Sequence, residues 1–164
     1  LWSVLADRIR NAEAKRVLDI GCGPGQFASC LFGLTDIQEY TGLDFSTQAV
    51  EMAKRVCSKG RFVVGDATTT TIHHEVPHDV VVCTEVLEHV PTDHAVIGRF
   101  KTGVRCLCTV PNFPYHSHVR HFNSASEVMD RYGHLFDRLD VWAMRANVNH
   151  YYFLLDGVRN ANAS

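Results

Sequence analysis

A run of apolar residues leads directly into a glycine-rich loop near the start of the chain. Residues 17–27 read V-L-D-I-G-C-G-P-G-Q-F, so a short apolar strand precedes glycines at positions 21, 23 and 25. Glycine tolerates positive φ and lets backbone N–H groups approach a bound molecule closely. A strand, a glycine loop and a helix in succession are typical of nucleoside binding at the carboxyl edge of a parallel sheet. We therefore expect an α/β fold whose loop holds a nucleoside-containing ligand.

The rest of the chain alternates helical with strand-like patterns, which favours a doubly wound, mostly parallel sheet. An opening helix is expected over residues 4–12, and the periodicity predicts further helices over 26–34, 47–57 and 124–132. The expected strands cover residues 16–20, 40–43, 61–64, 79–83, 104–110, 139–144 and 150–155. Residues 68–78 are polar, and we expect a loop there, with or without a short turn, and His73, His74 and His78 in solvent.

Composition limits the classes of protein that this chain can belong to. With 164 residues, 46% of them hydrophobic, it can bury one sizeable core, and we expect a single domain over residues 1–164. A formal net charge of −2 gives no overall attraction to nucleic acid or to an anionic membrane. No apolar run approaches the roughly 18 residues of a membrane span. The first residue is Leu1, so we also expect that an N-terminal segment is missing.

Six cysteines are scattered through apolar segments without a C-x-x-C pair. This distribution favours reduced core thiols and a cytoplasmic protein over a disulfide framework.

The spacing of the glycines separates the candidate ligands. A dinucleotide loop reads G-x-G-x-x-G, and its third glycine would stand where this chain has Gln26. No G-K-[ST] follows, which excludes a triphosphate-binding loop of the P-loop type. Asp44 ends the second predicted strand, where a carboxylate can accept hydrogen bonds from ribose hydroxyls, and Asp66 follows the third.

Four segments in register resemble one known family. V-L-D-I-G-C-G-P-G, Y-T-G-L-D-F-S, V-G-D-A and D-V-V-V-C-T-E-V-L-E-H-V follow one another between residues 16 and 112. Together they resemble the class I S-adenosylmethionine-dependent methyltransferases. The resemblance implies a Rossmann-like sheet of seven strands, mostly parallel with an antiparallel last strand.

The resemblance also implies a cofactor site for S-adenosylmethionine. The loop from Asp19 to Gly25 would enclose the methionine part, Asp44 would bind the ribose, and Phe45 would lie against the adenine. Asp66 and Ala67 would meet the adenine edge, and Thr84 would line the methyl side. The expected cofactor-binding residues are Asp19, Gly21, Cys22, Gly23, Gly25, Gln26, Asp44, Phe45, Asp66, Ala67 and Thr84.

A second cluster lies in T-E-V-L-E-H-V-P, residues 84–91. If a helical turn begins there, Glu85, Glu88 and His89 share one face and can bind a divalent metal such as Mg or Zn. A fourth ligand would come from His116, His118 or His121 in P-N-F-P-Y-H-S-H-V-R-H-F. Without a metal, the same side chains would support the active site through hydrogen bonds. We take Glu85, Glu88, His89 and His121 as the catalytic candidates, with His89 as the preferred general base.

These residues lead to several hypotheses about function. The main hypothesis is methyl transfer from S-adenosylmethionine to an oxygen or nitrogen of a small molecule, because E-x-x-E-H-V-P is similar to the ubiquinone-biosynthesis O-methyltransferases. One alternative is metal-assisted 2′-O-methylation of RNA 3′ ends, since the small-RNA methyltransferases carry a segment that resembles this one. The others are a non-catalytic cofactor-binding partner subunit and an NAD-dependent oxidoreductase, against which Gln26 counts. The sequence leaves the oligomeric state open.

Overall fold

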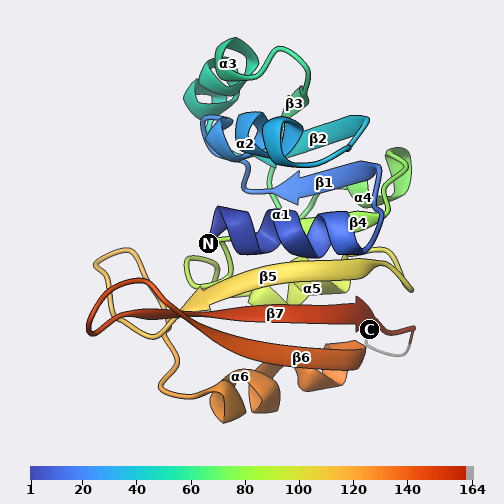
Figure 1. The fold of residues 1–164 in the computed structure, drawn as a ribbon. Coiled ribbons are helices and arrows are strands. Elements are labelled where there is room, and N and C mark those ends of the chain that lie inside the picture. Colours follow the sequence, from blue (N-terminus) through green and yellow to red (C-terminus); the bar gives the residue numbers. More distant parts are fainter. Residues whose placement is uncertain (162–164) are drawn as a thin grey trace. The chain divides into compact units, whose positions relative to one another are not determined.

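A computed structural model describes residues 1–161 of the chain (Figure 1). They divide into two compact units, the first over Leu1–Val82 and the second from Cys83 onward. The expectation of a single domain over residues 1–164 remains a prediction.

The first unit is a parallel sheet with its helices. Its elements are α1 (Trp2–Asn11), β1 (Arg16–Ile20), α2 (Gln26–Leu34), β2 (Glu39–Asp44), α3 (Thr47–Val56), β3 (Arg61–Val64), α4 (Ile72–Glu75) and β4 (Val80–Cys83), whose last residue opens the second unit. β1 pairs in parallel with β2 and with β4, and β2 pairs in parallel with β3. All four residues of β4 are buried, as expected for an apolar strand inside a parallel sheet.

Helix starts in the first unit follow local chemistry. The Ser46 hydroxyl accepts a hydrogen bond from the Ala49 N–H at 3.2 Å and so caps α3. Residues 72–75 form the short helix α4 within the predicted loop. The expectation of solvated histidines was wrong for His73 and His78, which are buried, whereas His74 is exposed. Ile72 and His73 both turn inward from this helix, which the polar composition of the segment did not indicate.

The second unit contains a three-stranded antiparallel arrangement. Its elements are α5 (Asp93–Gly98), β5 (Arg105–Pro111), α6 (Ala125–Tyr132), the 3-10 helix η1 (Gly133–Leu135), β6 (Phe136–Arg145) and β7 (Tyr151–Arg159). β7 runs antiparallel to both β5 and β6, and Figure 1 shows β6 and β7 as one long hairpin with α6 beside β6. Half of the predicted capping box of α6 is present, because the Glu127 N–H donates to the hydroxyl of the N-cap residue Ser124 at 3.2 Å. The Glu127 carboxylate accepts from the N–H of Asn123, one residue before the N-cap, at 2.8 Å.

The hydrogen-bonded strand order is β3-β2-β1-β4-β5-β7-β6. This order confirms the predicted seven-stranded α/β sheet, mostly parallel with an antiparallel last strand. Two features differ from expectation. The short helix α5 was not predicted, and β6 and β7 are longer than the expected segments 139–144 and 150–155. None of the helices within residues 1–161 has the length and apolar character that crossing a bilayer requires.

Candidate functional site: a glycine-loop cradle and an acid–histidine cluster

The glycine loop in the first unit lies between the end of β1 and the start of α2. The N–H groups of Gly21 and Cys22 both donate to the Leu43 carbonyl, at 2.7 and 3.0 Å, so the loop is tied to the end of β2. Gly21, Gly23 and Gly25 all have positive φ. At Gly25, where φ is 86°, an added Cβ would lie 2.8 Å from Ala53 Cα, so only glycine fits without strain.

Asp44 lies at the end of β2 and holds this loop. Its Oδ2 accepts from the Gly23 N–H and its Oδ1 from the Ser46 N–H, both at 2.9 Å. A carboxylate oxygen has more than one acceptor position, so these bonds leave capacity for ligand hydroxyls. The neighbouring Phe45 is 82% exposed, which is unusual for a phenylalanine side chain and leaves its ring available for stacking.

Asp19 lies beneath the loop, near the end of β1, and is 2% exposed. Its Oδ2 accepts from the Tyr40 hydroxyl, whereas Oδ1 has no hydrogen-bond partner among the described residues. Burial raises the pKa of Asp19 to about 7, the Asp44 charge adds to the rise, and the hydrogen bond from Tyr40 opposes it. A buried carboxylate oxygen without a partner is costly, and a cationic group of a ligand would relieve that cost.

The other predicted cofactor residues are distributed as follows. Cys22 is buried and Gln26 opens α2. Asp66 is exposed, and its Oδ1 accepts from both the backbone N–H and the hydroxyl of Thr68 at 2.7 Å, so it shapes the turn that carries Ala67. Thr84 follows β4 and belongs to the second unit.

The expected helical turn over residues 84–91 is absent, which corrects the sequence prediction. Glu85 adopts the left-handed conformation, with φ of 58°, and residues 87–89 form a turn. A non-glycine residue with positive φ is uncommon and marks a strained position. Thr109 holds Glu85 there, because its hydroxyl lies 3.3 Å from the Glu85 backbone nitrogen and 3.4 Å from Oε1.

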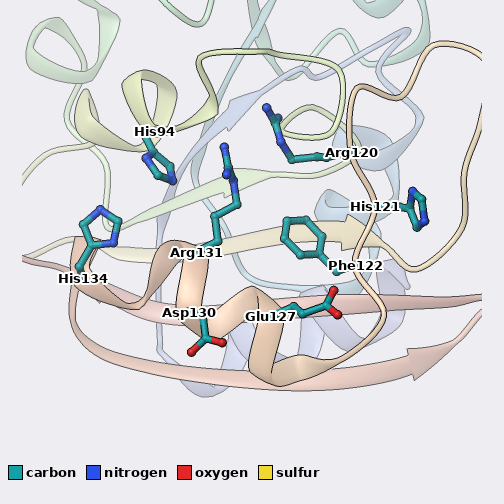
Figure 2. A pocket seen from close by; sticks show the side chains of 8 residues that line it. All are labelled: His94, Arg120, His121, Phe122, Glu127, Asp130, Arg131 and His134. Carbon is teal, nitrogen blue, oxygen red and sulfur yellow. The ribbon is translucent and has the colours of Figure 1, made fainter.

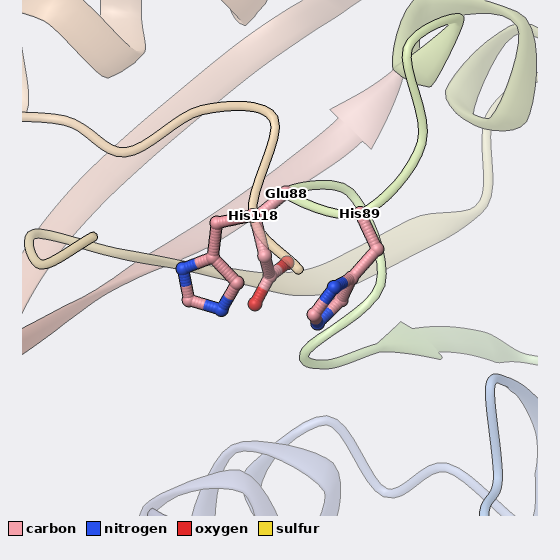
Figure 3. Close-up of side chains that lie close together, drawn as sticks. All are labelled: Glu88, His89 and His118. Carbon is pink, nitrogen blue, oxygen red and sulfur yellow. The ribbon is translucent and has the colours of Figure 1, made fainter. Parts of the chain in front are cut away.

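Glu88 and His89 nevertheless come together with a third residue, His118 (Figure 3). Each offers one ligand atom, and these three atoms lie within 4.8 Å of one another. Glu85, which the sequence placed in this set, lies outside the group, and His118 is the one of the three candidate histidines that takes part. We call Glu88, His89 and His118 the acid–histidine cluster.

The two histidines of the cluster are oriented by backbone carbonyls. His89 Nδ1 lies 3.1 Å from the Ser117 carbonyl, and His118 Nδ1 lies 3.2 Å from the Phe113 carbonyl. A carbonyl can only accept, so the proton is assigned to Nδ1 and the lone pair to Nε2 on each ring. Metal-binding histidines are commonly oriented in this way, with the second nitrogen donating to a carbonyl.

The carboxyl group of the cluster is buried. Glu88 is 0% exposed, and neither of its carboxylate oxygens accepts a hydrogen bond from another described residue. Burial, assisted by the Glu85 charge, raises the pKa of Glu88 to about 8, and the Arg120 charge opposes this rise. Burial also raises the pKa of Glu85, although hydrogen bonds from Tyr152 and Thr109 act in the opposite direction. Tyr152 was not singled out by the sequence, since only the pairing of β5 with β7 brings it near this segment.

His121 occupies a different place in the second unit. It is exposed and lines a cavity of about 630 Å³ (Figure 2). The residues around this cavity are His94, Arg120, His121, Phe122, Glu127, Asp130, Arg131 and His134.

Comparison with known proteins agrees with this geometry. The family described as "Methyltransferase domain" matches residues 17–105. The ubiquinone biosynthesis O-methyltransferase of Escherichia coli O157:H7 is 33% identical over 99 residues, which make up 58% of this chain and 40% of that protein. The enzyme of the same name from Glaesserella parasuis is 32% identical over 103 residues, covering 58% of this chain and 43% of its own. The chain thus spans less than half the length of these curated relatives.

Solved structures share the fold at low sequence identity. The small RNA methyltransferase HEN1 superposes with a TM-score of 0.77 at 16% identity, over 98% of this chain and 25% of that chain. The YcgJ protein of Bacillus subtilis superposes with a TM-score of 0.68 at 17% identity, over 98% of both chains. At these identities the likeness concerns the fold alone.

The cradle in the first unit fits the cofactor that a methyltransferase family implies. The unpartnered Oδ1 of Asp19 suits the ammonium group of S-adenosylmethionine, and Asp44 suits its ribose hydroxyls. The absence of a Cβ at Gly25 lets the loop pack closely against Ala53 in α3.

Proposed function

Because the chain belongs to the methyltransferase domain family, we propose that it transfers a methyl group from S-adenosylmethionine to a hydroxyl oxygen of a small-molecule acceptor. The observation that carries this proposal is the glycine loop, tied through the Gly23 N–H to Asp44 at the end of β2. The relatives named as O-methyltransferases favour oxygen over nitrogen as the acceptor atom.

In this proposal the first unit binds the cofactor. S-adenosylmethionine supplies an electrophilic methyl group, which the acceptor oxygen gains as the carbon–sulfur bond breaks and the hydroxyl proton leaves. The Asp19 carboxylate accepts hydrogen bonds from the ammonium group of the cofactor, and the Asp44 carboxylate accepts them from the ribose hydroxyls. The Phe45 ring stacks on the adenine. Catalysis of a displacement of this kind depends mainly on alignment of the reacting atoms, which these contacts provide at the cofactor end.

The second unit would supply the acceptor chemistry. His89 is the proposed general base, because its ring is exposed and its Nδ1 faces the Ser117 carbonyl, which leaves the Nε2 lone pair to accept a proton. Glu85 would orient the acceptor hydroxyl from its strained position. Glu88 remains a candidate catalytic residue because it belongs to the acid–histidine cluster. His121 remains a candidate because it lines the cavity described above.

As the alternative role for His89, in which its Nε2 is a ligand and not a base, we propose that the acid–histidine cluster holds a divalent metal. Two imidazole nitrogens and one carboxylate favour Zn or a similar transition metal over Mg, which prefers oxygen ligands. A bound cation would lower the pKa of an acceptor hydroxyl. Binding would also supply the partner that the buried Glu88 carboxylate lacks among the described residues.

The cluster also favours a second candidate function, metal-assisted 2′-O-methylation of RNA 3′ ends. A metal site can bind the two hydroxyls of a terminal ribose, and one solved structure of the same fold is a small RNA methyltransferase. The net charge of −2 argues against it, because neutralisation of phosphate charge supplies most nonspecific RNA affinity. A non-catalytic partner subunit and an NAD-dependent oxidoreductase remain weaker alternatives. The six free cysteines support a cytoplasmic location.

A methyl-transfer assay separates these possibilities. Purified protein is incubated with S-adenosylmethionine labelled in the methyl group and with either a catechol or a short RNA bearing a free 3′ diol, with and without a chelator. We expect label on the catechol. Label on RNA alone would select the second candidate, and no transfer to either acceptor by a protein that binds the cofactor would contradict both. Activity unaffected by chelation, with no metal in elemental analysis, would remove the metal from the proposal.

A further inference from the structure

We propose that Arg120 is a positioning residue, which fixes the turn carrying Glu88 and His89 against the loop carrying His118. This inference rests on the proposed function, since it assigns a role to the acid–histidine cluster. It also differs from the obvious alternative for an arginine in a substrate-side loop, which is direct contact with the acceptor.

The guanidinium of Arg120 donates to three carbonyls of one short segment. Nη1 donates to the carbonyls of Leu87 and Val90, the latter at 2.6 Å, and Nη2 donates to the Pro91 carbonyl at 3.0 Å. Residues 87–91 form neither helix nor strand, so regular secondary structure does not satisfy these carbonyls. A planar guanidinium has several donors in a fixed arrangement and can hold such a turn at several points.

The positive charge of the Arg120 guanidinium is balanced by the carboxylate of Asp93. Its side chain is 15% exposed, and Nη1 lies 3.3 Å from Oδ2 of Asp93, which is itself 1% exposed. Arg131 donates to both oxygens of Asp93, at 2.8 and 2.6 Å, and the Tyr132 hydroxyl donates to it at 2.6 Å. Figure 2 shows the guanidinium groups of Arg120 and Arg131 pointing away from the acidic groups of Glu127 and Asp130. These buried contacts keep the Arg120 guanidinium directed at the turn.

The same contact region aligns the members of the cluster. The residue before Arg120, Val119, donates its N–H to the Glu88 carbonyl at 2.8 Å. His118 directly precedes Val119, and its ring lies 4.8 Å from the ring of His89 between centroids. The loop and the turn are therefore joined on both sides of Glu88. Ligand side chains need such support, because a site that is loose by about 1 Å loses much of its function.

Arg131 offers a matched control for this role. It binds the same aspartate as Arg120, but within residues 1–161 none of its hydrogen bonds reaches residues 87–91. Loss of Arg131 should weaken the packing of α5 against the helical segment around Tyr132, and it should leave the clamp on the turn in place.

The test compares Arg120→Met, Arg120→Lys and Arg131→Met in the full chain. Three quantities are measured: amide hydrogen exchange at Val119 by NMR, affinity for Co²⁺ by visible absorbance, and affinity for S-adenosylhomocysteine by calorimetry. For Arg120→Met we expect exchange at Val119 to rise about tenfold. We expect Co²⁺ affinity to fall about 10- to 100-fold, as for loss of a supporting contact in a metal site. Affinity for S-adenosylhomocysteine should change by less than about twofold, because a positioning contact in the second unit does not bind the cofactor.

Each outcome bears on the proposal. In Arg120→Lys, part of the protection of the Val119 amide against hydrogen exchange should be recovered. This variant replaces Arg120→Met in the test if Arg120→Met does not fold. Unchanged exchange at Val119 in both Arg120 variants would overturn the proposal, as would equal changes in Arg131→Met. If the unaltered protein binds no Co²⁺, a rise in exchange confined to the Arg120 variants still supports the clamp, although the metal is then removed from the proposed function.

Discussion

Asp19 is a carboxyl group enclosed by apolar strands, and its protonation links the glycine loop to pH. Its pKa is raised from 3.8 to about 7, first by burial and then by the Asp44 charge. The folded state therefore holds a proton that the unfolded state releases near pH 4. The resulting stabilisation is fully present below the unfolded pKa and is lost as the pH rises through about 7.

We predict that Asp19→Asn removes this pH dependence. Relative to the variant, the unaltered protein should lose free energy of unfolding between about pH 4 and pH 7, by at most about 1.4 kcal/mol per pH unit. Urea unfolding at several pH values measures the difference. Parallel stability curves for the two proteins would contradict the raised pKa.

Gly25 is the residue where the loop tolerates no side chain. Its φ is 86°, and an added Cβ would lie at a distance of only 2.8 Å from Ala53 Cα, so we predict that Gly25→Ala distorts the loop. A left-handed conformation costs an L-residue about 1–2 kcal/mol, so affinity for S-adenosylhomocysteine should fall at least about tenfold. The control is Gly33→Ala in α2, where nothing lies within 4 Å and alanine should be neutral or stabilising. Equal cofactor affinity in both variants would refute this role for Gly25.

At the scale of elements, α5 and α6 are joined by one buried carboxylate. Asp93 begins α5, and both Arg131 and Tyr132 belong to α6. The hydrogen bonds from these two residues keep the pKa of Asp93 low although burial alone would raise it.

We predict that Arg131→Met destabilises the protein by about 2–3 kcal/mol. The estimate lies at or below the usual cost of breaking a buried pair, because Arg120 and Tyr132 still face Asp93. Lys54→Met is the matched surface control, since Lys54 and Glu51 are both about half exposed, and its loss should leave the free energy of unfolding nearly unchanged. Denaturant unfolding of both variants provides the measurement. Similar losses would show that the Asp93 contact is no stronger than a surface pair.

Elements whose patterns are local could be predicted from the sequence. The glycine loop, the strands that end at Asp44 and before Asp66, and the Ser124 N-cap are each encoded within a few residues. Three other features depend on distant parts of the chain. His118 joins Glu88 only because the loop after β5 folds back on the turn, His73 is buried by tertiary packing, and Arg120 finds its carbonyl partners about thirty residues earlier. The helix α5 is six residues long, too short for a clear apolar period.

At the scale of the whole molecule, the proposed chemistry is divided between two units of different construction. The parallel strands of the first unit bring glycine N–H groups and acids to the same strand ends, which suits a nucleoside-containing cofactor. The second unit carries the acid–histidine cluster on irregular segments before α5 and after β5. Loops on a regular scaffold commonly determine specificity, so the identity of the acceptor depends on this second set of residues.

The central claim is that the glycine loop binds S-adenosylmethionine. Calorimetric titration with S-adenosylhomocysteine and, separately, with NAD tests it most directly, using the unaltered protein and Asp44→Ala. We predict binding of one S-adenosylhomocysteine per chain, no heat with NAD, and at least about tenfold weaker binding in the variant, which loses the contacts to the ribose and to Gly23. Binding of NAD without S-adenosylhomocysteine, or no heat with either ligand, would contradict the claim.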